Sequence, residues 1–177
     1  MLTYALLLLL GLLGGVIAVA SLRPEAFRVS RSAIVGAPAE AVFEEIADFR
    51  KWESWSPWAK LDPNVKNSFD GSPGAVGSSF EWSGNSKVGA GKMTLLECVK
   101  EEMLRIRLNF ERPMKAENLV TFALSAAGES TKVTWSMSGK NNFIAKLFGL
   151  FMNVEKMCGN DFEKGLANLK TLLEERP

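Results

Sequence analysis

The residue types best suited to proton transfer are missing from most of this sequence. It contains no histidine, and its only tyrosine, Tyr4, lies in an apolar N-terminal stretch. Histidine is the side chain that most readily exchanges protons near neutral pH. Acid–base chemistry would therefore depend on Asp, Glu, Lys or Cys, and the carboxyl and amine groups would need burial to bring their pKa values near neutrality. This composition argues against general acid–base catalysis.

Three side chains are in phase with apolar residues and merit a closer look. Glu97 alternates with Met93 and Leu95, so it is a candidate for an inward-facing carboxylate, and the alternative is a solvated residue at a strand end. Arg31 follows the same alternation in an earlier stretch, although a one-residue bulge would reverse its direction. Cys158 lies on the apolar stripe of a predicted helix and is most simply a small core residue. We assign none of the three a catalytic role.

Cofactor, metal and nucleic-acid sites lack support. Cys98 and Cys158 lie far apart and, without histidine, form no ligand set of the usual spacing. The glycine-rich stretch 84–91 has Ala90 where a P-loop would carry lysine, so we interpret it as a hairpin turn. The 21 basic residues nearly balance the 20 acidic ones and form no one-sided stripe. We expect no cofactor, no metal and no nucleic-acid partner.

An uncharged, strongly apolar stretch opens the chain from Leu2 to Ala20. As an α-helix it would reach about 28 Å, close to the hydrocarbon thickness of about 30 Å. We predict a single-pass transmembrane anchor over residues 1–22 and a separate domain over 25–177. The alternative is a cleaved signal peptide, because residues 18–20 form an A-x-A pattern, but no basic residue precedes the stretch. Arg23 and Arg28 follow it, which places the domain in the cytoplasm by the positive-inside rule.

The C-terminal stretch from Asn142 to Glu175 organises the predicted domain. Its apolar residues recur at steps of three and four, which indicates an α-helix with one buried face. Internal glycines such as Gly149 favour a bend or a close backbone contact. We predict a short helix over about 143–151 and a longer one that ends near Glu175.

Stretches of alternating apolar and polar residues predict an antiparallel sheet of seven strands. Two short helical stretches follow the first strand, and Trp52, Trp55 and Trp58 crowd into them. These tryptophans are a hydrophobic plug or, alternatively, the mouth of a ligand site. The strands are predicted at 27–35, 65–69, 76–82, 91–99, 104–110, 118–124 and 132–138.

Several stretches resemble polyketide cyclase/dehydrase-type proteins of the SRPBCC superfamily, which includes START and Bet v 1-like domains. They are APAEAVF at 37–43, WESWSPW at 52–58, GKM at 91–93, TKVTW at 131–135 and DFEKGLANL at 161–169. The resemblance covers about residues 27–175. It implies an α+β helix-grip fold, in which a seven-stranded antiparallel sheet wraps around a long C-terminal helix and encloses a deep apolar cavity.

These observations favour a membrane-tethered monomeric domain that binds an apolar small molecule or lipid. The alternatives are a cyclase or dehydratase acting on a polyketide-like substrate, and a domain whose core is filled and takes no ligand. The predicted cavity lining consists of inward-facing residues of the sheet, one tryptophan before it and the helix stripe. These residues are Trp55, Phe80, Trp82, Met93, Leu95, Ile106, Leu108, Phe110, Phe122, Trp135, Met137, Leu150, Val154 and Cys158.

Overall fold

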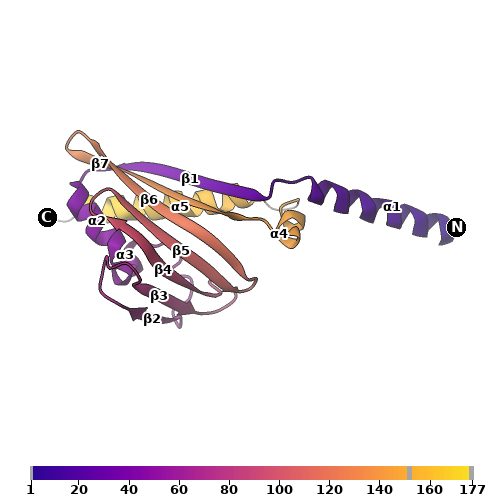
Figure 1. The fold of residues 1–177 in the computed structure, drawn as a ribbon, viewed down its shortest axis with the longest axis horizontal. Helices are drawn as coiled ribbons and strands as arrows, with labels where there is room; N and C mark the ends of the chain where they lie inside the picture. The colour runs from indigo at the N-terminus through magenta and orange to yellow at the C-terminus, as the bar shows by residue number, and fades with distance from the viewer. Residues whose placement is uncertain (1, 151–152, 176–177) are drawn as a thin grey trace.

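A curved antiparallel sheet grips a long C-terminal helix, and a separate N-terminal helix projects from one end (Figure 1). The computed structural model describes residues 2–150 and 153–175. The elements in chain order are α1 (Leu2–Ser21), β1 (Ala26–Val35), α2 (Ala39–Ala47), the 3-10 helix η1 (Phe49–Lys51), α3 (Trp52–Trp55), β2 (Lys66–Asp70), β3 (Ser79–Ser83), β4 (Ala90–Val99), β5 (Met103–Arg112), β6 (Ala116–Ala127), β7 (Ser130–Lys140), α4 (Phe143–Phe148) and α5 (Val154–Glu174).

The sheet has the strand order β1-β7-β6-β5-β4-β3-β2, and every neighbouring pair is antiparallel. The predicted count of seven strands and the α+β class are therefore confirmed. The strand predicted at 76–82 begins later, at Ser79, because the chain turns through Gly74 and Gly77, both at positive φ. Glycine adopts this conformation without the steric cost that a side chain would add.

The break in the C-terminal helical region is also confirmed. Asn142 caps α4 by accepting a hydrogen bond from the Ala145 amide, and Asn153 caps α5 by accepting one from the Lys156 amide. Position 151, the predicted end of the short helix, lies outside the described residues. Asn142 and Asn153, which are 11 positions apart, each begin a separate helix, although the apolar periodicity continues from one helix into the next.

Helix α5 packs its apolar stripe against the inner face of the sheet. Phe162, Leu166, Leu169 and Leu173 are buried at steps of four, three and four. Gly165 permits this close packing, because a Cβ there would lie 2.6 Å from the ring of Trp135. Helix α5 therefore approaches the sheet more closely than it would with alanine at this position.

Helix α5 also runs beside β1 in the same direction. The Arg31 guanidinium contacts Glu155 near the start of α5, and the Gly36 amide donates to Glu174 Oε1 at its end, over 2.6 Å. Contacts at both ends fix the helix along the first strand.

Helix α1 confirms the predicted N-terminal helix. Its leucines from Leu6 to Leu13 are exposed, with 75% of Leu8 and 69% of Leu12 accessible. Within the part of the chain that the structure describes, no helix reaches the length and hydropathy required of a membrane span. α1 and α4 lie side by side where the chain enters the domain (Figure 1).

We expect residues 25–177 to fold without α1. The hydrophobic core cluster extends from Val29 to Leu173, so the truncated chain retains these residues. The truncated protein should give a folded circular dichroism spectrum and a cooperative thermal transition like that of the full chain in mild detergent. An unfolded spectrum would contradict this expectation and would mean that the domain needs contacts from α1.

Candidate ligand-binding face

The structure divides the predicted cavity lining into a buried centre and a half-buried end. Trp55, Phe122 and Trp135 belong to the centre, and none is more than 2% exposed. The ring of Trp135 stacks on Phe162 of α5 with centroids 4.4 Å apart, and the tilted ring of Phe122 lies 4.9 Å from Trp135. Leu95 and Ile106 are buried in the same core. These side chains occupy the middle of the grip between sheet and helix.

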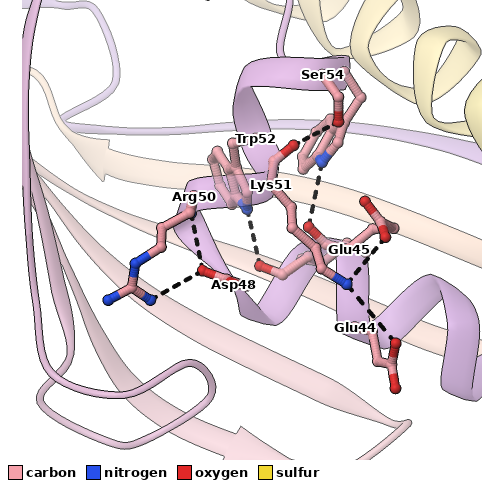
Figure 2. Close-up of polar contacts among 9 residues, drawn as sticks. Glu44, Glu45, Asp48, Arg50, Lys51, Trp52 and Ser54 are labelled. Atoms are coloured by element: carbon pink, nitrogen blue, oxygen red, sulfur yellow. Dashed lines mark hydrogen bonds and ion pairs between the residues drawn. The ribbon is translucent and has the colours of Figure 1, made fainter.

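Two tryptophans are held in the core by backbone carbonyl groups of α2. The Trp52 indole N–H donates to the Ile46 carbonyl oxygen over 2.9 Å, and that of Trp55 donates to the Glu45 carbonyl oxygen over 3.3 Å (Figure 2). Both buried indole N–H groups are therefore hydrogen-bonded, and the two bonds join α3 to α2. Trp52 and Trp55 are buried, as the plug interpretation predicts, and Trp58 packs edge-on against Trp135.

The half-buried end carries three aromatic residues of the inner face. Phe80 and Trp82 from β3 lie 5.8 Å apart, and Phe110 from β5 meets Trp82 edge-on at 5.9 Å. Trp82 donates its indole N–H to the Val88 carbonyl oxygen over 3.0 Å. Its ring lies against Gly91, where a Cβ would leave only 2.5 Å. We call Phe80, Trp82 and Phe110 the aromatic end of the inner face.

The register places this aromatic end on the same side of the domain as α1. Trp82 is opposite Gly91, Gly91 is opposite Phe110, and Phe110 is opposite Ala116 at the start of β6. The neighbouring strand ends are the start of β1, which follows α1, and the end of β7, which precedes α4. The half-buried aromatic rings therefore lie toward the end of the sheet from which α1 projects.

Other predicted lining residues connect or flank these two groups. Met93, Leu108 and Met137 are buried in the core, and Cys158 contributes a half-buried side chain from α5. Leu150 is half-buried after α4. Val154 is 42% exposed in the first turn of α5, so it differs from the buried lining predicted for it.

Glu97 does not lie on the inner face of the sheet, so the inward direction inferred from its alternation with Met93 and Leu95 is wrong. The β4–β5 register shifts between Leu95 and Glu97, which marks a bulge at that point. A bulge adds one residue and reverses the alternation beyond it. Glu97 consequently lies opposite Arg105 and pairs with its guanidinium at 3.0 Å on the outer face. Cys98, opposite buried Leu104, packs against the core instead.

Arg31 does point toward α5, as its phase predicts. Its guanidinium lies against Gly159 and bonds Glu155 at 2.8 Å and Glu163 at 2.6 Å. Hydrogen bonds to Glu155 and Glu163 raise the pKa of Arg31 above its usual value. Glu155 and Glu163 lie four positions before and after Gly159, and this spacing is a signal for the contact in the sequence. Arg31 therefore joins β1 to α5 through its two ion pairs.

Neither cysteine is activated as a nucleophile. Burial raises the pKa of the Cys98 thiol, and burial followed by Asp161 and Glu155 raises that of Cys158. A raised thiol pKa leaves less thiolate at neutral pH, and the thiolate is the reactive form. Both cysteines are free. Among residues 2–150 and 153–175, no three His, Cys, Asp or Glu side chains gather in a group able to hold a metal ion.

A charged surface depression lies outside the inner face and was not anticipated from the sequence. It has a volume of about 430 Å³ and is lined by Glu45, Arg50, Lys51, Glu53 and Ser54. Lys51 pairs with Glu45 at 3.2 Å and approaches Glu44 at 3.8 Å (Figure 2). These polar contacts hold the turn between α2 and α3.

The sheet, the two short helices and the gripping of α5 define a helix-grip domain of the SRPBCC superfamily. Residues 26–174 match the family described as polyketide cyclase / dehydrase and lipid transport, and the chain belongs to this family. No curated protein matches the sequence.

Three solved structures illustrate the similarity of fold. CV1439 from Chromobacterium violaceum is 18% identical with a TM-score of 0.61, and the match covers 87% of this chain and 100% of that one. MLL2253 from Mesorhizobium loti is 18% identical with a TM-score of 0.64, covering 85% and 99%. CalU16 from Micromonospora echinospora is 18% identical with a TM-score of 0.55, covering 86% and 85%. At these identities the similarity concerns the fold.

Proposed function

We propose that this protein is a membrane-attached domain that binds an apolar small molecule or a lipid at the aromatic end of its inner face. The observation that carries the proposal is the half-burial of Phe80, Trp82 and Phe110, while the centre of the same face is closed by stacked rings. Partly exposed aromatic rings bind apolar ligands because contact removes apolar surface of both partners from water. The family description, which includes lipid transport, supports this class of ligand.

The chemistry of the inner face favours binding over turnover. Glu97 lies on the outer face, and the raised pKa values of both thiols disfavour nucleophilic attack. Arg31 is held by two glutamates of α5. The cyclase or dehydratase alternative therefore has no proton-transfer residue among the candidates that the sequence provided.

A domain with a filled core and no ligand is the second candidate function. The contacts among Trp52, Trp55, Phe122, Trp135 and Phe162 favour it, because they close the space that a large central ligand would need. The two candidates differ in the behaviour of the aromatic end, which is open to a ligand in one and only a boundary of the core in the other.

Membrane attachment through α1 is the second part of the proposal. The exposed leucines of α1 are unfavourable in water, and their burial in lipid is worth about 25 cal/mol per Å² of apolar surface removed from water. Arg23 and Arg28 follow the helix directly. Basic residues beside an apolar helix favour the cytoplasmic side, so we propose a cytoplasmic domain.

We expect the full chain to remain in the membrane fraction through high-salt and carbonate washes. Attachment by apolar side chains does not depend on surface charge, so neither treatment should release it. Immunoblotting of the washed fractions measures the result, with residues 25–177 as the soluble control. Release by carbonate, or a mature N-terminus at Ser21, would support a cleaved signal peptide instead.

Saturable binding of an apolar probe tests the ligand proposal. A fatty acid titrated into the protein should change tryptophan fluorescence, because Trp82 lies at the proposed site. Mass spectrometry of material extracted from the purified protein would identify a natural ligand. Absence of saturable binding across fatty acids, isoprenoids and aromatic polyketides would overturn the proposal and favour the filled-core domain.

A further inference from the structure

Helix α4 exposes an apolar surface that the domain does not cover. Phe143, Ile144 and Phe148 are 47%, 53% and 51% exposed, and no residue of α4 is buried. Scattered exposed apolar residues are ordinary, but three large ones on a six-residue helix form a patch that water disfavours. This surface requires an explanation outside the folded core.

The position of α4 is fixed relative to the point where α1 leaves the domain. The Asn141 amide donates to the Glu25 carbonyl oxygen over 2.7 Å, and the Asn141 side chain donates to the Pro24 carbonyl oxygen over 3.2 Å. These bonds tie the segment before α4 to the linker between α1 and β1. α4 therefore stays beside the base of α1, as Figure 1 shows.

Basic side chains accompany the apolar surface. Arg23 packs against Gly149 at the end of α4. Lys140 lies just before the helix, and Lys146 lies within it. Glu25 is the acidic residue of the adjoining linker. Apolar residues combined with lysine and arginine match the region of a bilayer where acyl chains meet anionic headgroups.

We infer that α4 lies in the lipid interface and holds the aromatic end of the domain against the membrane surface. The inference rests on the proposed attachment of α1, which brings the base of that helix to the bilayer. Phe143, Ile144 and Phe148 then insert among the upper acyl chains, while Arg23, Lys140 and Lys146 face the headgroups. Phe80, Trp82 and Phe110, at the same end of the sheet, come close to the lipid from which an apolar ligand would be taken.

Fluorescence quenching by brominated lipid tests this placement in the full chain. Phe148→Trp places a probe on α4, and Ile144→Trp places a second on the same exposed surface. Ile34→Trp is the matched control, because Ile34 is 55% exposed on β1, near the end of that strand farther from α1. Each variant is reconstituted in vesicles of phosphatidylcholine and phosphatidylglycerol, with or without bromine on the acyl chains, and the unmodified protein supplies the background of its five tryptophans.

The α4 probes should emit at shorter wavelength and lose intensity in the brominated vesicles, and the Ile34→Trp signal should not change. Vesicle-bound protein with equal, weak quenching of all three variants would overturn the inference and leave the attachment of α1 intact. A blue shift without quenching would also overturn it, because α4 would then be covered by protein. Protein that stays in the aqueous fraction would defeat the attachment itself, and this inference with it.

Discussion

Replacing Phe162 by alanine should lower the free energy of unfolding by about 3 to 5 kcal/mol. The ring is 2% exposed and stacks on Trp135 at an interplanar angle of 7°. Removing it forfeits buried apolar area and leaves a cavity between α5 and the sheet, because Trp135 and Leu166 are already packed on other side chains. Urea unfolding of residues 25–177, followed by circular dichroism, measures the change.

Phe69→Ala is the control for this substitution. Phe69 is 37% exposed on the edge strand β2, where it stacks on Phe80 at 5.0 Å and lies under the Arg50 guanidinium at 5.7 Å, so its removal should cost only about 1 to 2 kcal/mol. The cavity in the Phe162→Ala protein should also bind an apolar probe that the parent does not bind at its centre. A loss below that of Phe69→Ala would contradict the view that the middle of the grip is filled.

Replacing Phe110 by aspartate should weaken the binding of an apolar ligand by about tenfold or more, which is about 1.4 kcal/mol. Phe110 contacts Trp82 at the proposed site, and a carboxylate there would lose its hydration when an apolar ligand binds. Because Phe110 is only half-buried, the stability cost should be about 1 to 2 kcal/mol. Titration of tryptophan fluorescence with a fatty acid measures the affinity.

Val99→Asp is the matched control for this charge. Val99 is 38% exposed at the opposite end of the sheet, beside the turn between β4 and β5, and its replacement should leave binding unchanged. Phe122→Asp should instead unfold the domain, because Phe122 is completely buried among Trp52, Trp55 and Trp135. Unchanged affinity in Phe110→Asp would locate the ligand elsewhere or favour the filled core.

The sequence alone determined the elements because each has a local signal. The alternation through Ile106 and Leu108 predicted both the strand β5 and the side chains on its inner face. This prediction is correct because the pairing of β5 with β6 has no bulge to reverse the alternation. The apolar steps of the C-terminal stretch similarly marked its helical character, whereas the Asn153 cap that begins α5 was identified only in the structure. The family resemblance then supplied the order in which strands and helices assemble.

Only the tertiary structure decided which inner-face side chains are fully buried and which are half-buried. The bulge before Glu97 reverses the phase of β4, and nothing in the alternation announces it. Whether Trp135 borders a cavity or closes one depends on its distance from Phe162, a residue 27 positions later in the chain. The close packing of α5 at Gly165 brings the two rings into contact. Periodicity specifies the face of an element, whereas filled or open space depends on how two faces meet. The packing of α5 on the inner face of the sheet closes the centre of that face and leaves its aromatic end half-buried.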